Sequence, residues 1–312
     1  METGSAPRNV VGTSPYGEAD EIGRLNLITP ESRARILARV DASRTYDLSV
    51  DYFMGMPTWV AAGDPTYQIS MSHTPSGTVV DSLSGQTREM NERIGYSGDV
   101  IAMYTHCGTH IDTLNHWGYG DEIWNHFNAK EHLGSRHWTK CGADKMPPII
   151  ARGVLLDVAA TKGVSMLPES YPITPEDLAE TVEREQIRLE EGDVVLIHTG
   201  RMTVWDNPQR FLVNGPGLNV KAAQWLVEEH GAMILGADQA TVEYQPATDV
   251  PGHYLPVHLY LIVEVGVPML EVMWLEEIAR DRVYEFAFFG APLRLRGSTG
   301  APIHPWAMPL RK

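Results

Sequence analysis

Cysteine is scarce in this sequence, and uninterrupted hydrophobic runs are short. Only Cys107 and Cys141 occur among the 312 residues, which excludes a disulfide-stabilised scaffold and indicates a reducing compartment. The longest apolar stretch, near residues 257–270, contains a glutamate, a glycine and a proline, so it is too interrupted to span a bilayer. The first eight residues lack the apolar segment of a secretion signal. We therefore expect a cytoplasmic protein.

Positive charge is also scarce. Lysine and arginine together number 25 against 40 aspartates and glutamates, and the formal net charge is -15. Such an acidic surface repels nucleic acids and anionic membranes, so neither is expected as a partner. The composition is otherwise ordinary for a globular enzyme, with 43% apolar and 21% charged residues, and the chain is long enough to bury a large core. The expected partner is a small-molecule substrate.

Signature motifs of several enzyme classes are missing. The sequence contains no Gly-x-Gly-x-x-Gly and no Walker loop, which disfavours nucleotide-driven chemistry. It contains no Gly-x-Ser-x-Gly elbow either, which disfavours a serine hydrolase.

Helix and strand signals alternate in the second half of the sequence, which predicts a mixed α/β fold. Thr29 and Thr174 each precede a proline and a glutamate, a pattern typical of helix N-caps, and Asn219 is expected to cap a further helix. Residues 1–20 are predicted to form an N-terminal arm, and residues 21–312 a single domain. The expected strands of this half cover residues 154–158, 194–198, 232–235 and 283–289.

Residues 46–97 give weaker signals. Leu48, Val50, Tyr52 and Met54 alternate along the sequence, which indicates β structure between residues 46 and 60. The polar stretch from residue 61 to residue 97 contains many turn formers, so we expect short strands and a mobile loop there.

Six of the 12 histidines fall between His106 and His137. On a helix, Asp112 would point about 240° away from His106. On an extended segment, residues 106, 108, 110 and 112 all point to the same side. β-Branched neighbours favour the extended form, and Gly108 then leaves no side chain between the two imidazoles. The spacing predicts a metal site made of His106, His110 and Asp112.

The alternative interpretation is that these residues are ordinary buried polar groups. A lone histidine is more often a satisfied core residue than a ligand, but burying several unpaired polar groups together is costly. Cys107 points the other way on a strand and is expected to be a small buried hydrophobic residue. Large aromatic residues near the motif could shape a pocket for a flat ring or belong to the core. They are Trp59, Trp117, Trp124 and Phe127.

The segment His106-x-Gly-Thr-His110-x-Asp112-x-x-x-His116 resembles the signature of the metal-dependent cyclase family, which includes bacterial kynurenine formamidases and isatin hydrolases. Other segments resemble the family as well, so the resemblance covers most of the chain beyond the first 20 residues. These segments are residues 23–31, Asp47-Leu-Ser with Pro57-x-Trp59, residues 193–200, 236–238 and 256–258, and the later Gly266 and Glu271.

The resemblance implies a fold and a set of ligands. The fold would be a mixed-sheet cyclase-like domain of the swivelling β/β/α type, and the protein a homo-oligomer, either a dimer or a tetramer. His106, His110 and Asp112 would bind a divalent metal ion. His258 and Glu271 are the best matches to the residues that complete a two-metal site in formamidases.

The resemblance also implies functional roles. His116 would be the catalytic acid or base, and Trp59 would contact the substrate. Gln239 stands where many members have threonine, which makes it a candidate substrate contact. Phe127 is a further candidate because it is one of the aromatic residues near the motif.

Two or three protein ligands leave positions on a metal ion for water and substrate. The ion can lower the pKa of a bound water from 15.7 to about 7. We therefore predict a hydrolase in which this water attacks the carbonyl of a cyclic amide, lactone or arylformamide, with His116 as general acid/base. Zinc and manganese suit the ligands alike, as one or two ions per subunit. The alternatives are a cyclase or dehydratase that uses the ion as a Lewis acid, and a non-catalytic metal-dependent binding protein.

Overall fold

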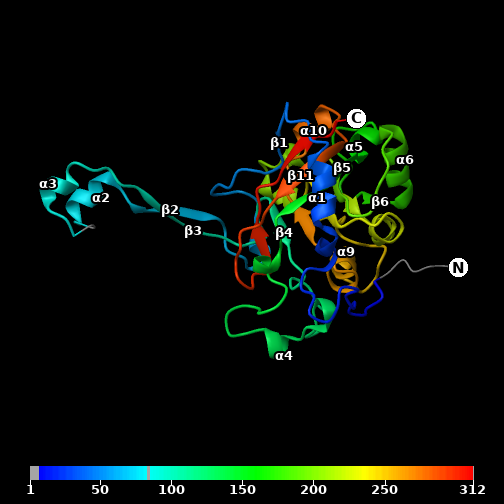
Figure 1. The fold of residues 1–312 in the computed structure, drawn as a ribbon, viewed down its shortest axis with the longest axis horizontal. Helices are drawn as coiled ribbons and strands as arrows, with labels where there is room; N and C mark the ends of the chain where they lie inside the picture. The colour runs from blue at the N-terminus through cyan, green and yellow to red at the C-terminus, as the bar shows by residue number, and fades with distance from the viewer. Residues whose placement is uncertain (1–6, 83–84, 312) are drawn as a thin grey trace.

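A nine-stranded mixed sheet lies at the centre of the computed structural model, which describes residues 7–82 and 85–311 (Figure 1). The strand order is β1-β13-β11-β5-β7-β9-β10-β4-β12. The strands of this sheet are β1 (Tyr46–Asp47), β4 (His110–Asp112), β5 (Ile149–Asp157), β7 (Val194–His198), β9 (Ile234–Ala237), β10 (Met269–Glu271), β11 (Glu285–Gly290), β12 (Gly300–Pro302) and β13 (Trp306–Pro309). Two small sheets pair β2 (Gln68–His73) with β3 (Gly98–Ala102), and β6 (Pro172–Ile173) with β8 (Gly217–Leu218).

The helices are short, and two of them continue as π-helical turns. The α-helices are α1 (Pro30–Leu37), α2 (Pro75–Val80), α3 (Arg88–Asn91), α4 (Ala129–His132), α5 (Val158–Thr161), α6 (Pro175–Glu185), α7 (Pro208–Leu212), α8 (Val220–Gln224), α9 (Pro256–His258) and α10 (Glu276–Arg280). The π-helical turns cover Trp225–Glu229 after α8 and Leu259–Glu264 after α9. No helix in the described part of the chain is long and apolar enough to cross a membrane.

The core lies on both faces of the parallel strands β5, β7, β9 and β10. All five residues of β7 are buried, as expected for a parallel strand that is covered on both sides. Side chains from α5, α6, α8 and α9 pack in one hydrophobic cluster, α10 and the segment around Leu25 contribute to a second, and a third includes Cys107 and Val272. The predicted mixed α/β fold is confirmed.

The predicted helix starts are confirmed. Thr29 and Thr174 cap α1 and α6 with their side chains, and each forms a reciprocal capping box with the residue three positions later. The Asn219 side chain accepts a hydrogen bond from Ala222 N and caps α8. β7 has the predicted bounds, but β5 begins at Ile149, earlier than predicted, because it pairs antiparallel with β11 from that residue onward.

The β structure expected between residues 46 and 60 is largely wrong. Only Tyr46–Asp47 forms a strand, at the edge of the sheet beside β13. Beyond it the chain crosses toward β4, where Val50 N donates to Thr109 Oγ1 at 2.9 Å. Leu48 and Val50 are buried and Met54 is exposed, so the alternation reflects burial against neighbouring loops.

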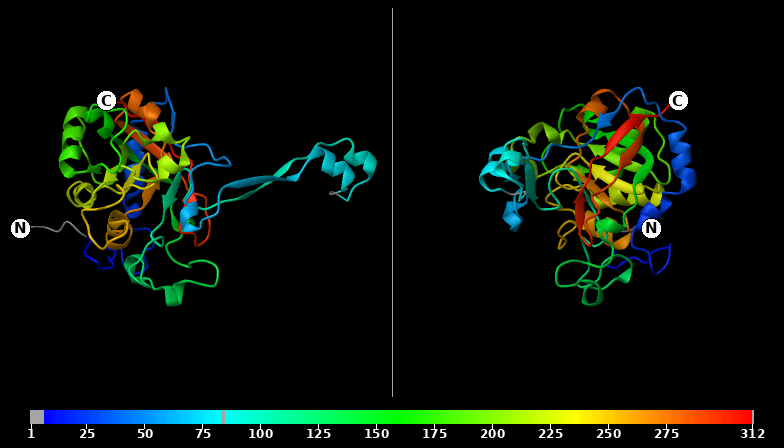
Figure 2. Two further views of the ribbon diagram at one scale, coloured as in Figure 1. Left: turned by 180° about the vertical axis from the view of Figure 1, so that it is seen from behind. Right: turned by 60° about the vertical axis from the view of Figure 1, so that its left-hand side comes forward.

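Residues 68–102 form a projection that we call the hairpin arm. β2 and β3 make its two-stranded stem, and α2 and α3 lie at its far end (Figures 1 and 2). Short strands were expected in this region, whereas the two helices were not. Both helices begin at a threonine whose side chain caps them, Thr74 and Thr87.

The described part of the predicted N-terminal arm packs against the domain. Val11 is buried in the core, and Gly12 N donates to Val263 O at 2.9 Å. Ser14 Oγ donates to Asp20 Oδ2 at 2.6 Å. Residues 1–6 of that arm lie outside the described residues.

Candidate metal centre

The candidate metal centre forms where the short strands β4 and β10 pair antiparallel. Glu271 lies directly opposite His110 in this pairing, so the two side chains share a face. Asp112 points to the same face because side chains alternate along a strand. His110 Nε2 lies 3.3 Å from Asp112 Oδ1 and 3.4 Å from Glu271 Oε2. Backbone register therefore gathers one imidazole and two carboxylates.

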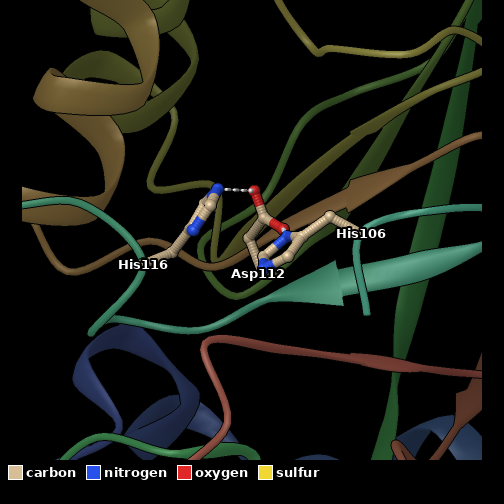
Figure 3. Close-up of side chains that lie close together, drawn as sticks. All are labelled: His106, Asp112 and His116. Carbon is tan, nitrogen blue, oxygen red and sulfur yellow. Dashed lines mark hydrogen bonds and ion pairs between the residues drawn. The ribbon is translucent and has the colours of Figure 1, made fainter. Parts of the chain in front are cut away.

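His106 and His116 reach the centre from the turns on either side of β4, and both imidazoles approach the Asp112 carboxylate (Figure 3). His106 Nδ1 lies 2.6 Å from Asp112 Oδ1, and His116 Nε2 lies 3.9 Å from Asp112 Oδ2. The two imidazole rings stack with centroids 3.9 Å apart. The prediction of one extended segment from residue 106 to residue 112 is wrong in its first half, because only His110–Asp112 is a strand.

His258 enters the centre from α9. Its Nε2 lies 3.4 Å from Glu271 Oε1 and 3.9 Å from Asp112 Oδ2. Its Nδ1 lies 2.5 Å from Glu243 Oε1, and the buried Glu243 carboxylate also accepts the backbone N–H groups of Val257 and His258. Glu243 was not predicted, since no motif in the sequence links it to a histidine 15 residues later.

Two imidazoles are oriented through Nδ1. His110 Nδ1 donates to Gly108 O at 2.8 Å, as His258 Nδ1 does to Glu243, which leaves both Nε2 atoms facing Glu271. Burial by itself lowers the pKa of His110, but the carboxylates of Asp112 and Glu271 outweigh it and raise the pKa to about 10. Burial by itself also lowers the pKa of His258, but the carboxylates of Glu243 and Glu271 outweigh it and raise the pKa to about 10. The carboxylates thus favour positive charge at the centre, which a bound cation would also supply.

The pKa of His116 is shifted in the opposite direction from the pKa values of His110 and His258. Burial, with the neighbouring His106, lowers the pKa of His116 well below its ordinary value, against the effect of Asp112. Burial alone would raise the pKa of Asp112, but the surrounding histidines hold it well below its usual range. The His116 side chain is 20% exposed, compared with 1% for His110. At neutral pH its imidazole is therefore uncharged, and it is partly accessible to solvent.

The donor set fits a divalent cation. Among the described residues, His110 Nε2 and Asp112 Oδ2 are buried without a hydrogen-bond partner, which is costly unless another group binds them. His110, Asp112 and Glu271 place ligand atoms within 4.8 Å of one another, and so do His106, Asp112 and His116. These two groups share Asp112. In this structure both ring nitrogens of His106 already have partners, since its Nε2 lies 2.9 Å from Thr299 Oγ1.

Gly108 was expected to leave no side chain between the imidazoles of His106 and His110, but the structure gives it a different role. Its φ is +61°, and a Cβ at this position would lie 2.7 Å from the Tyr52 ring. The Tyr52 hydroxyl donates to Thr109 O. Glycine is therefore needed where the chain turns from His106 into β4, because a side chain would meet Tyr52 there.

A cavity of about 180 Å³ opens beside the centre. Trp59, the expected substrate contact, lines it, whereas Gln239 and Phe127 are not among its lining residues. Gln239 Nε2 donates to Glu243 O at 3.3 Å, and Phe127 belongs to the hydrophobic core. A larger cavity of about 420 Å³ lies beside α1, but no histidine lines it. The aromatic and imidazole lining of the smaller cavity consists of Trp59, Tyr104, His106, His116, Trp117, Tyr254 and His258.

Cys107 is buried, as predicted. It is 2% exposed, and burial raises the pKa of its thiol to about 11. A protonated, buried thiol is a poor nucleophile, so Cys107 contributes packing to this region.

A third group of ligand-type side chains lies at the carboxyl ends of β7 and β9. It comprises His198, Asp238 and Glu276. Asp238 accepts hydrogen bonds from the successive backbone N–H groups of residues 199–201, and His198 Nδ1 lies 2.8 Å from Asp157 Oδ1. These polar atoms already have partners, so the group forms an internal ion-pair network.

Residues 46–244 match the model of the Cyclase family. This match covers more than half of the 312 residues. The chain belongs to the Cyclase family. The resemblance seen in the sequence is thereby confirmed. No curated protein matches the sequence.

Solved structures share the fold of this cyclase-family protein. A crystal structure described as a novel cyclase has a TM-score of 0.83 at 27% identity, covering 96% of this chain and 100% of that one. Isatin hydrolase A from Labrenzia aggregata, bound to benzyl benzoate, has a TM-score of 0.61 at 19% identity, covering 85% and 93% of the two chains. Isatin hydrolase A from Ralstonia solanacearum has a TM-score of 0.62 at 18% identity, covering 92% and 96%. The predicted cyclase-like fold is confirmed.

Proposed function

We propose that this protein is a metal-dependent hydrolase that opens a cyclic amide or lactone, or cleaves an arylformamide. The observation that supports this most directly is the group of His110, Asp112 and Glu271, with unpartnered buried atoms, beside an aromatic-lined cavity. These residues would hold the ion, and His258 would join them through its Nε2. When bound, a divalent zinc or manganese ion stabilises negative charge on a carbonyl oxygen and makes water acidic near neutral pH.

His116 is the proposed proton carrier. Its depressed pKa keeps the imidazole uncharged at neutral pH, so one ring nitrogen is free to accept a proton, and its side chain lines the cavity. Stacking on His106 and an edge contact with Trp117, at a centroid distance of 5.8 Å, hold the ring in place. The imidazole can therefore accept a proton from water and return it to the leaving nitrogen or oxygen.

The cavity supports a flat, compact substrate. Its volume of about 180 Å³ slightly exceeds the roughly 150 Å³ of an apolar cavity that binds benzene. Trp117 and Tyr254 both line the cavity, and aromatic side chains pack favourably against a flat ring. Proteins named isatin hydrolase share this fold, which supports a cyclic amide as the first substrate to assay.

The test begins with elemental analysis of the purified protein. It continues with turnover of isatin-like lactams, arylformamides and small lactones in oxygen-18 water. We expect a bound divalent metal and one solvent oxygen in the product. Turnover without solvent oxygen in the product would instead assign a cyclase or dehydratase reaction.

Replacing His116 with alanine distinguishes an enzyme from a binding protein. The His116→Ala variant should keep its metal but lose about 10²- to 10⁴-fold in kcat, because general acid/base catalysis contributes that much. Steady-state kinetics and metal analysis of the same sample check this. His126→Ala is the matched control, since the His126 side chain is 50% exposed and does not line the cavity. A wild-type kcat in His116→Ala would contradict the role of this residue.

A further inference from the structure

The cavity beside the candidate metal centre contains a carboxylate that no basic side chain balances. Asp64 lines this cavity, and its side chain forms no ion pair or hydrogen bond within the described part of the chain. None of the described residues that line the cavity is a lysine or an arginine. A substrate that enters the cavity therefore meets an unpaired negative charge, which a positive charge on the substrate would stabilise.

A tight turn brings Asp64 and Trp59 to the same cavity. Trp59 precedes a short 3₁₀ helix, Val60–Ala62, which ends at Gly63 in the left-handed conformation with φ +93°. Glycine adopts this conformation without strain. Asp64 N then donates to Trp59 O at 3.4 Å, so the turn closes on the aromatic residue that begins it. The turn thus places one carboxylate and one indole in the cavity wall.

Further aromatic side chains line the cavity. Besides Trp59, they belong to Tyr104, Trp117 and Tyr254. Tryptophan and tyrosine rings attract a cation that lies within about 6 Å of the ring centroid, and groups of aromatic residues bind ammonium ions in this way. A positively charged group would therefore gain from these rings as well as from Asp64, whereas an anionic group would be repelled by Asp64.

The charges behind the cavity act in the same direction. Asp112, Glu243 and Glu271 are buried carboxylates of the centre, and Asp64 adds a fourth negative charge at the cavity wall. Histidines that bind a metal ion are neutral, so a divalent ion leaves two of the four negative charges unbalanced. One positive charge on the substrate would reduce this excess, and a substrate carboxylate would increase it. The net charge of -15 for the chain also favours the approach of a cation.

We propose that Asp64 selects substrates that carry a protonated amine on the part of the molecule away from the scissile carbonyl. This inference rests on the proposed hydrolase function, which places that carbonyl at the metal centre. A cavity of about 180 Å³ holds little more than one aromatic ring, so a substituent on the ring meets the cavity wall. The substrate class is then an arylformamide, cyclic amide or lactone that has an aminoalkyl substituent and no carboxylate.

The first experiment measures binding without turnover. Benzylamine and benzyl alcohol have similar sizes, but only the amine is positively charged at neutral pH. Each is titrated into the full-length metal-loaded protein by calorimetry. Benzylamine should bind about 10-fold more tightly than benzyl alcohol, a difference of about 1.4 kcal/mol. In Asp64→Asn, the affinity for benzylamine should fall to that for benzyl alcohol, and the affinity for benzyl alcohol should not change.

Asp51→Asn is the matched control for this experiment. Asp51 is exposed and does not line the cavity, so this variant should bind both compounds as the wild type does. Unchanged metal content and circular dichroism show that both variants are folded.

The second experiment connects binding to the reaction. Formanilide and its 4-aminomethyl derivative contain the same formamide bond, and only the derivative carries a protonated amine. The derivative should have a kcat/KM about 10-fold higher in the wild type, and the two values should become similar in Asp64→Asn. The change should appear mainly in KM, because Asp64 contacts a part of the substrate that does not react.

Two results would overturn the proposal. The first is equal affinity of the wild type for benzylamine and benzyl alcohol. The second is an affinity for benzylamine that Asp64→Asn leaves unchanged, which would assign the amine to the metal ion. If neither formamide nor any lactam or lactone is hydrolysed while Asp64-dependent binding of benzylamine persists, the hydrolase function fails and the selection of a cation by Asp64 stands.

Discussion

Asp112 is the residue that connects the four histidines of the centre. Its carboxylate lies 2.6 Å from His106, 3.3 Å from His110, and 3.9 Å from both His116 and His258. It is fully buried and belongs to both groups that could hold an ion. At the residue scale, the site is thus organised around one shared carboxylate. The histidines around it are positioned by further residues that lie outside the histidine motif.

Glu243 is one of these further residues, and it acts through His258. The Glu243→Gln substitution keeps a carbonyl oxygen but removes the negative charge that orients His258 Nδ1. We expect metal affinity to fall about 10- to 100-fold, as for other residues that support a ligand. A competition titration against a chelating dye measures this. Glu277→Gln, at an exposed position of α10, is the control, and equal affinities in the two variants would contradict the role of Glu243.

Gly300 allows the close approach of His106. It lies opposite Asp112 in the β12–β4 pairing, and a Cβ there would lie 2.5 Å from His106 Cε1. Gly300→Ala should therefore displace the imidazole and lower kcat/KM about 100-fold, the cost of misplacing a group by about 1 Å. Gly134→Ala, whose Cβ would meet its nearest neighbour at 3.4 Å, should have nearly wild-type kinetics. The prediction fails if both variants have the same kcat/KM.

At the element scale, the carboxyl ends of the parallel strands carry a second polar network. Asp157 ends β5 and His198 ends β7, and α6 contributes Glu185. Burial alone would lower the pKa of His198, but Asp157 and Glu276 outweigh it and raise the pKa to about 10. Glu185 Oε1 accepts a hydrogen bond from Asp157 N at 2.9 Å. Glu185 Oε2 is buried without a hydrogen-bond partner among the described residues.

This network makes stability depend on pH through Glu185. Burial raises the pKa of Glu185 from an ordinary 4.5 to about 8. Between these values the unfolded chain loses the proton while the folded chain keeps it, so rising pH favours unfolding by up to about 1.4 kcal/mol per pH unit. Below pH 4.5 both states are protonated and the effect vanishes.

The Glu185→Gln variant should remove this dependence. Its melting temperature relative to the wild type should rise steadily from pH 5 to pH 8. Thermal unfolding of both proteins across this range measures the difference. Glu183→Gln, exposed on the same helix, is the control and should follow the wild type. A constant difference between Glu185→Gln and wild type over the range would disprove the assignment.

At the scale of the whole molecule, the metal centre joins distant parts of the chain. His110 and Asp112 come from β4, Glu271 from β10 and His258 from α9. An ion bound by these residues stabilises the folded state, because the unfolded chain does not hold the residues together.

Chelation should therefore lower the melting temperature. An ion present at 100 times its dissociation constant contributes about 2.7 kcal/mol, or about 4 °C for a protein of this size. Thermal unfolding with and without excess chelator measures the shift, and added metal should reverse it. His110→Ala should bind little metal and show no chelator effect. Equal melting temperatures of the metal-loaded and chelated wild type would contradict a structural contribution from the ion.

Local signals account for the parts of the fold that were predicted correctly. Thr29, Thr174 and Asn219 cap helices through atoms three residues away, so short-range sequence contains the information. The bounds of β5 were missed because pairing with β11, which is more than 100 residues distant, sets where the strand begins. Short strands were expected in the region of the hairpin arm, but their pairing was not predicted because it joins residues about 30 positions apart.

The candidate site also combines local features that the sequence shows with long-range contacts that it does not show. The alternation of His110 and Asp112 along β4 is local and was visible in the sequence, and His258 and Glu271 were matched through the resemblance to the cyclase family. The turn that carries His106, the support of His258 by Glu243 and the close contact of Gly300 were not predicted, since each depends on residues that only folding brings together.

By itself, the sequence determined the residue types of the centre, the starts of the main helices and the formal net charge of -15. Those properties depend on composition and on spacings within a turn or a short strand. The tertiary structure decided which carboxylate faces which imidazole, which aromatic residues reach the cavity and where the hairpin arm lies. Strand pairing and loop packing join residues more than 100 positions apart, and no local pattern specifies such contacts.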